Sequence, residues 1–233
     1  MQQKEQVQHN ICSACFIVDC EECQPYRKKG LTIKKCSATI LTIIQEEGKM
    51  MKISVRDIVL IALFASLTAV MALFVSIPLP FSPVPLTGQA FAVMLAGLLL
   101  GARRGALSQL VYILLGAVGL PVFANARAGF SVIIGPTGGF LWGFVLGAYI
   151  IGKMVEKRTK PTLYYLFAAT ALGGVVAVYI PGILQLSLVA GMTVLQAATA
   201  MVVFLPGDII KVIASALLAH RVRATGLIQS AQK

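Results

Sequence analysis

The stretch DIVLIALFASLTAVMALFVSI, residues 57–77, carries a single charged residue, Asp57, at its first position. An α-helix needs about 20 consecutive, mostly apolar residues to cross the hydrocarbon core of a bilayer. This stretch therefore predicts a transmembrane helix, and the proline-rich sequence PLPFSPVP that follows predicts where the helix ends.

The composition of the whole chain agrees with this reading. The 233 residues are 58% hydrophobic and 12% charged, with a mean hydropathy of +0.84, whereas about a quarter of the residues of a soluble domain are charged. The net charge of +11 does not indicate nucleic-acid binding, because the basic residues stand at the ends of apolar runs without interleaved aromatic residues. We expect contacts with the lipid bilayer and no nucleic acid.

Further apolar runs follow the first one, and together they predict an all-α, polytopic membrane protein with six transmembrane helices. Several runs are short for a crossing, which favours tilted helices or a locally thinned bilayer. The membrane domain is expected at residues 50–223, with a short C-terminal tail at 224–233. The later spans are expected at about residues 88–100, 106–120, 137–152, 163–189 and 205–219, with a partial helix at 193–203 leading into the last.

The basic residues predict the orientation, since loops on the cytoplasmic side are enriched in Lys and Arg. With six spans and both termini inside, every basic cluster falls on one side, and the opposite loops contain one charge, Arg127. The clusters are Lys52 and Arg56, then Arg103 and Arg104, then Lys153, Lys157, Arg158 and Lys160, and finally Arg221 and Arg223.

Residues 1–49 differ from the rest, because they hold all five cysteines and six of the nine acidic residues. We expect an N-terminal extension that is disordered or translated from a misassigned start, since Met51 opens a sequence typical of a membrane protein. The alternative is a zinc site, because CSACFIVDCEEC (residues 12–23) contains two C-x-x-C pairs. A spacer of only four residues between the pairs argues against that site.

Three ionisable residues, Arg127, Asp208 and Lys211, are not explained by topology. Asp208 and Lys211 belong to LPGDIIK (residues 205–211), and a spacing of three places them on one face of a helix. Charges inside a membrane are costly and by default mark a functional site. We expect an outward-facing pocket for a small, anionic, hydrogen-bonding ligand. The alternatives are a mutually neutralising pair that holds the bundle together and a loop arginine that faces water.

Three motifs together resemble the BioY family, the biotin-specific S components of energy-coupling-factor (ECF) transporters. They are PVPLTGQAFAVMLAGLLLGARRGALSQLVYILLGAVGLPVF (residues 83–123), GPTGGFLWGF (135–144) and LPGDIIK, in order within residues 51–222. The resemblance implies a six-helix S-component bundle in the plasma membrane of a prokaryote. It also implies capture of biotin outside the cell and coupling to a transmembrane T component and two cytosolic ATPase subunits. No cofactor is expected in this chain, because it has no ATP-binding motif and ATP would be used by the partners.

The resemblance also implies site residues. Asp208 and Lys211 would bind the ureido group of biotin, assisted by Asn125, and we add Arg127 as the partner of the carboxylate. The stretch ANARAGF (residues 124–130) departs from the more glycine-rich loop of the family, which bears on the roles of Asn125 and Arg127.

Four further residues have two readings each. Gln89 and Tyr112 are expected either to line the pocket or to form hydrogen bonds between helices. Ala65 and Ala69 resemble the motif by which S components dock on the T component, and packing inside the bundle is the alternative.

Other functions fit the sequence less well. Residues 50–233 contain one histidine, no cysteine and no paired carboxylates, so an enzyme is not expected. An ion- or proton-coupled carrier of small anions that uses Asp208 and Lys211 is the alternative to biotin capture. The glycines Gly138, Gly139 and Gly143 are expected to allow close helix packing.

Overall fold

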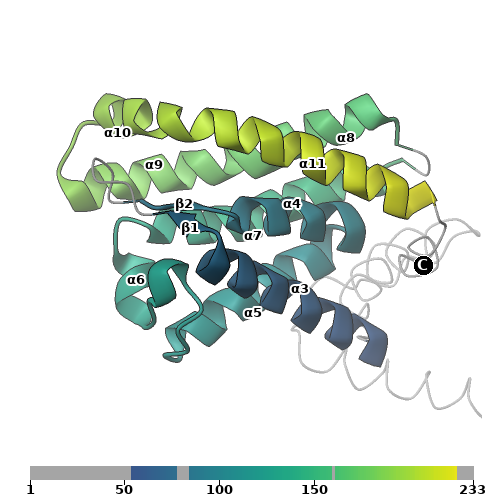
Figure 1. Ribbon diagram of the computed structural model, residues 1–233, viewed down its shortest axis with the longest axis horizontal. Coiled ribbons are helices and arrows are strands. Elements are labelled where there is room, and N and C mark those ends of the chain that lie inside the picture. The colour runs from purple at the N-terminus through teal and green to yellow at the C-terminus, as the bar shows by residue number, and fades with distance from the viewer. Residues whose placement is uncertain (1–53, 78–83, 159–160, 225–233) are drawn as a thin grey trace, which may run out of the picture. The chain divides into compact units, whose positions relative to one another are not determined.

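The computed structural model describes residues 54–77, 84–158 and 161–224, which belong to one compact unit. This unit consists mostly of helices, which confirms the predicted helical class (Figure 1). A short strand pair departs from it, because β1 (Ser76–Ile77) lies antiparallel to β2 (Leu86–Thr87). The longer helices are α3 (Val55–Phe74), α4 (Gln89–Leu100), α5 (Ala102–Ala117), α7 (Gly138–Glu156), α8 (Leu163–Thr170), α9 (Ala177–Ala190), α10 (Val194–Met201) and α11 (Leu205–Ala224).

Four helical stretches among the described residues are long and apolar enough to cross a bilayer. Two of them are α3 and α7. In the third, α8 continues through the π-helical segment η2 (Ala171–Val176) into α9, and in the fourth α10 continues through the 3-10 turn η3 (Val202–Phe204) into α11. The helix α4 is apolar but has only 12 residues, and α5 has 16. The protein is therefore a multi-pass membrane protein.

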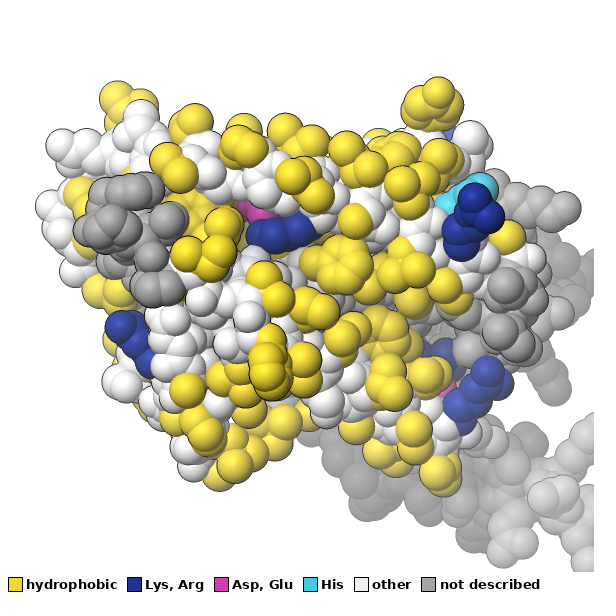
Figure 2. All heavy atoms as spheres, in the orientation of Figure 1, with side chains coloured by type: hydrophobic (Ala, Val, Ile, Leu, Met, Phe, Trp, Pro, Cys, Tyr) yellow, Lys and Arg dark blue, Asp and Glu magenta, His cyan; other side chains and the backbone are white. Residues whose placement is uncertain are grey.

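The surface of the unit is suited to lipid. Figure 2 shows hydrophobic side chains over most of one face, with basic side chains gathered mainly toward its right-hand end. Large apolar residues such as Val118, Leu188 and Phe74 are more than 80% exposed. A water-soluble unit rarely exposes so many large apolar side chains together, whereas a bilayer solvates them.

Helix α7 occupies the centre of the bundle, where it contacts α4, α5, α8 and α9. Its contact with α9 depends on glycine, as the sequence predicted. A Cβ atom at Gly139 would lie 2.2 Å from the carbonyl oxygen of Pro181, and one at Gly143 would lie 2.8 Å from Cα of Val178. The two backbones therefore approach too closely for any side chain between them.

Several helix boundaries differ from the prediction. Helix α3 ends at Phe74 rather than at residue 77, because Ser76–Ile77 form β1. Helix α5 begins at Ala102 rather than near residue 106, because Gly101 turns the chain with a φ of +84° and Glu156 Oε1 accepts a hydrogen bond of 2.8 Å from the amide of Ala102. The last helix is also longer than expected. Residues 194–224 are continuously helical, so the predicted partial helix and the predicted span at 205–219 form one element of 31 residues.

The basic ends of the helices lie at one end of the bundle. Arg104 Nε in the first turn of α5 is 3.2 Å from Asp57 Oδ1 in the first turn of α3. Arg223 in the last turn of α11 donates to the carbonyl oxygen of Leu98 near the end of α4 over 2.7 Å. Glu156 at the end of α7 adds its hydrogen bond to the start of α5. These bonds connect the starts of α3 and α5 with the ends of α4, α7 and α11 in one layer.

We expect Gly139→Ala to destabilise the protein by about 1–3 kcal/mol, because the new methyl group overlaps the backbone of α9. Thermal unfolding in detergent measures the change. Gly207→Ala is the matched control in another helix, where a Cβ meets only Leu86 Cδ1 at 3.7 Å. Equal melting temperatures for the two variants would contradict the close contact of α7 and α9.

Candidate functional site

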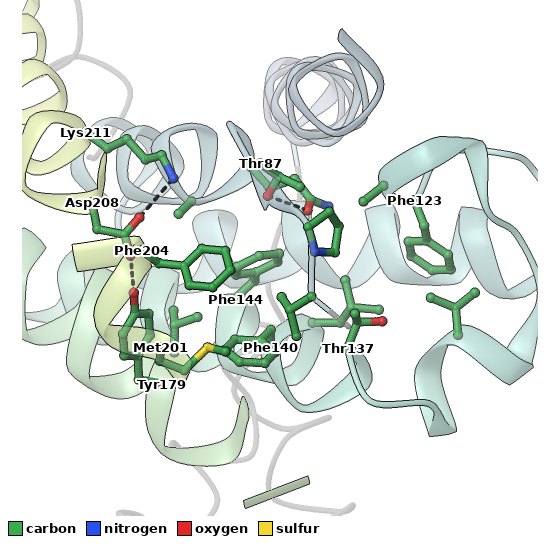
Figure 3. Close-up of a pocket in the computed structure, with 18 of the residues that line it drawn as sticks. Thr87, Phe123, Thr137, Phe140, Phe144, Tyr179, Met201, Phe204, Asp208 and Lys211 are labelled. Atoms are coloured by element: carbon green, nitrogen blue, oxygen red, sulfur yellow. Dashed lines mark hydrogen bonds and ion pairs between the residues drawn. The ribbon is translucent and has the colours of Figure 1, made fainter. Parts of the chain in front are cut away.

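One pocket collects side chains from most elements of the bundle. Its middle is apolar and is formed by Phe140 and Phe144 of α7, Phe204 of η3 and Met201 of α10. Figure 3 shows these four residues between Asp208, Lys211 and Tyr179 on one side and Thr87 and Thr137 toward the other. The remaining lining residues include Val84, Pro85, Gln89, Ala90, Phe123, Ala124, Asn125, Arg127, Val132, Leu141, Gly174 and Val178.

The charged pair predicted from LPGDIIK stands in this pocket. Lys211 Nζ lies 2.9 Å from Asp208 Oδ1, within the first two turns of α11. The other carboxylate oxygen, Oδ2, accepts a hydrogen bond from the hydroxyl of Tyr179 on α9. Asp208 is only 6% exposed. A buried charge is tolerated when it is paired and hydrogen-bonded, and both conditions hold here.

Asn125 and Arg127 reach the pocket from the loop between α5 and α7. The loop makes a tight 3-10 turn, η1 (Ala124–Ala126), in which Asn125 and Ala126 have φ values of +58° and +55°. Backbone bonds close the turn, because the amide of Phe123 donates to the carbonyl of Arg127 over 3.1 Å. Ser76 of β1 donates to Asn125 Oδ1 over 3.0 Å. Both predicted residues are exposed to the outside of the bundle and line the pocket.

A buried polar chain anchors this loop behind the pocket wall. Tyr112 of α5 donates to the carbonyl oxygen of Val122 over 3.1 Å and accepts from Gln89 Nε2 at the start of α4. Thr87 then donates to Gln89 Oε1 over 3.0 Å. The ring of Phe123 meets that of Tyr112 edge to face, with centroids 5.6 Å apart. The chain thereby fixes Gln89 and the loop relative to each other.

These contacts separate the two predictions made for Gln89 and Tyr112. Gln89 lines the pocket, and it also forms the expected hydrogen bond between helices. Tyr112 is fully buried and is not among the lining residues. Its hydroxyl is hydrogen-bonded to Gln89 and to the carbonyl of Val122. Tyr112 therefore forms the expected hydrogen bond between helices and does not line the pocket.

Sequence reasoning missed Tyr179 and the aromatic middle of the pocket. Tyr179 lies in an uninterrupted apolar run of α9, where a single phenol gives no periodic signal. Phe140 follows the glycines of GPTGGF, and its ring meets Tyr179 edge to face at 6.4 Å. The glycine motif therefore marked the correct segment, although the aromatic residue in it was not singled out.

The remaining candidates lie elsewhere. Ala65 is 1% exposed and belongs to the hydrophobic core, as the packing alternative requires, while Ala69 is partly buried against that core. Their role in docking stays a prediction. The five cysteines fall outside the described residues, so the zinc hypothesis is not tested. Within the described ranges, no three His, Cys, Asp or Glu side chains gather to hold a metal.

Comparisons with known proteins give a consistent result. The profile of the BioY family matches residues 46–226. A protein of Rhizobium etli named "Biotin transporter BioY" is 42% identical over 176 residues, which cover 72% of this chain and 94% of that one. A protein of the same name from Thermotoga maritima is 39% identical, covering 72% and 96%.

A solved structure is also similar. It is described as the S component for biotin from an ECF-type ABC transporter, and it superposes with a TM-score of 0.72 at 27% identity. The match covers 77% of this chain and 96% of that one. The similarity therefore extends over nearly the whole of the solved protein.

We expect Tyr112→Phe to lower the free energy of unfolding by about 1–3 kcal/mol, because both Gln89 and the carbonyl of Val122 lose a buried partner. Thermal unfolding in detergent measures the loss. Tyr149→Phe on α7 is the matched control, since Tyr149 is 43% exposed. Equal stability of the two variants would show that the polar chain does not anchor the loop.

Proposed function

The chain belongs to the BioY family, and from this premise we propose that it is the membrane-embedded subunit that captures biotin outside the cell and delivers it inward. The relatives are named as transporters, so the protein is a transport protein and not an enzyme. The observation that carries the proposal is the single pocket in which the paired Asp208 and Lys211, an aromatic middle and Arg127 occur together.

The charged side of the pocket matches the ureido ring of biotin. That ring offers two N–H donors and one carbonyl acceptor. Asp208 is an acceptor with two oxygens, and the ammonium of Lys211 has three donors, of which one faces Asp208. We assign one N–H group to Asp208 and the adjacent carbonyl to Lys211, with Asn125 assisting. Hydrogen bonds to charged groups are among the strongest in proteins, and a buried site strengthens them.

The remainder of biotin matches the rest of the pocket. The apolar ring system fits the walls formed by Phe140, Phe144 and Met201. The valerate tail ends in a carboxylate, for which Arg127 is the cation at the pocket lining. Gln89 is a further lining residue. The ligand thus lies with its ureido group toward Asp208, Lys211 and Asn125 and its carboxylate toward Arg127.

We further propose six membrane crossings with both termini on the cytoplasmic side and the pocket open to the outside. The layer of basic helix ends supports this orientation, because Arg104 and Arg223 lie there with the ends of α4 and α7. Positively charged ends face the cytoplasm in membrane proteins. In this arrangement the short helices α4 and α5 each cross the membrane where the bilayer is locally thinned. The membrane is the plasma membrane of a prokaryote.

Delivery of biotin is energised by partners in this proposal, since the chain has no ATP-binding motif. The partners are a transmembrane T component and two cytosolic ATPases. Helix α3 is the docking element, and of the two alanines that resemble the docking motif only Ala69 is partly exposed, whereas Ala65 packs inside the core. Between the pocket and the basic end, the core residues Leu98, Ile151 and Val155 are fully buried. A closed core favours reorientation of the whole subunit over passage of biotin through it.

Calorimetric titration of the purified protein in detergent tests the binding function. We expect the native protein to bind biotin and Asp208→Asn and Lys211→Met to weaken binding by about 100-fold or more, because each substitution strands a buried charge or removes a charged hydrogen bond. Lys153→Met at the basic end is the control and is expected to bind normally. Failure of the folded native protein to bind biotin would overturn the proposal.

The role of Arg127 is tested by comparing the binding of ligands with and without a carboxylate. We expect Arg127→Met to weaken biotin about three- to tenfold, an effect limited by solvent because Arg127 is exposed. Biotin methyl ester, which lacks the carboxylate, is expected to bind the native protein and this variant equally. An equal loss of affinity for both ligands would show that Arg127 does not bind the carboxylate and acts on the conformation of the loop instead.

A further inference from the structure

Asp208 is held from two helices. Lys211 on its own helix binds Oδ1 over 2.9 Å, and the hydroxyl of Tyr179 on α9 donates to Oδ2. We propose that Tyr179 is a positioning residue, which fixes the plane of the Asp208 carboxylate so that it receives an N–H group of the ligand beside the ammonium of Lys211. This inference rests on the proposed biotin-binding function and deepens it.

The hydrogen-bonding capacity of the carboxylate supports this role. A carboxylate offers about four acceptor positions, two on each oxygen. In the described part of the chain, Lys211 takes one position on Oδ1 and Tyr179 takes one on Oδ2. One position therefore remains on each oxygen. The two N–H groups of a cyclic urea diverge on either side of its carbonyl, so the carboxylate accepts one of them while the neighbouring carbonyl faces Lys211.

Lys211 alone does not fix the carboxylate. It lies three residues away on the same helix, and a flexible four-carbon stem carries its charge, so the ammonium follows the carboxylate as it rotates. Tyr179 approaches from another helix with a rigid ring. A carboxylate clamped between two elements loses its rotational freedom before the ligand arrives, which lowers the entropic cost of binding.

The fold holds Tyr179 firmly. Its ring meets Phe140 of α7 edge to face, with an interplanar angle of 84°. Its neighbour Val178 contacts the glycine surface of α7, where a Cβ at Gly143 would clash with it. Tyr179 thus lies at the contact between α7 and α9. The two backbones touch directly there, so the helices cannot shift relative to each other.

The π-helical segment η2 lies immediately before α9, the helix that carries Tyr179. Gly174 of this segment lines the pocket together with Val178 and Tyr179 of α9. Segments of this kind occur frequently at functional sites.

A double-mutant cycle tests the proposal, with biotin affinity measured by calorimetry and by equilibrium dialysis against radiolabelled biotin. We expect Tyr179→Phe to weaken biotin about tenfold in the native background and less than about twofold in the Asp208→Asn background, because the phenol acts through the carboxylate. Should Asp208→Asn bind too weakly to measure, Asp208→Glu closes the cycle. The extra methylene moves its carboxylate away from the position in which Asp208 accepts from the phenol.

The outcomes are distinguishable. Equal weakening in both backgrounds, or unchanged affinity in Tyr179→Phe, would overturn the positioning role, since the residue would then act by packing or not at all. No binding by the native protein would instead overturn the biotin function. Tyr149→Phe is expected to retain native affinity and controls for the loss of a phenol on an exposed helix face. Circular dichroism and gel filtration verify that each variant is folded.

Discussion

A carboxylate buried in an apolar bundle is the constraint on which this structure depends. Asp208 is 6% exposed and lies within a membrane-spanning stretch, where an unpaired charge would cost several kcal/mol. Two side chains bond to this carboxylate: Lys211 on the same helix and Tyr179 on α9. The arrangement requires α9 and α11 to keep a fixed distance at this point, and the packing of α9 against α7 and of α11 against α4 and α8 supports it.

Glycine supplies part of the rigidity. Gly139 and Gly143 allow α7 to contact the backbone of α9, which sets the position of Tyr179. The π-helical segment η2 before α9 contributes Gly174 to the pocket lining. On the opposite wall, the hydrogen bonds of Tyr112 hold Gln89 and the loop that carries Asn125. Gly139, Gly143 and Tyr112 therefore stabilise the two walls without lining the pocket themselves.

The sequence predicted the parts of this structure that depend on local patterns. Apolar runs identified a multi-pass helical protein, and the spacing of Asp208 and Lys211 predicted a pair on one helix face. Arg127 was singled out as a charge that topology does not explain, whereas Asn125 and Gln89 were predicted to line the pocket through the resemblance to a family. The start of α5 was missed because Gly101 and Glu156 together determine it, and these residues are 55 positions apart. Tyr179 was missed because it lies in a long apolar run of α9, where a single phenol gives no periodic signal.

A crystal structure of the protein with biotin bound tests the central claim most directly. We predict that one ureido nitrogen lies within hydrogen-bonding distance of the Asp208 carboxylate and the ureido oxygen within that distance of Lys211 Nζ, while the hydroxyl of Tyr179 remains on Oδ2. Biotin bound elsewhere in the bundle, or a Tyr179 side chain turned away from the liganded carboxylate, would contradict it.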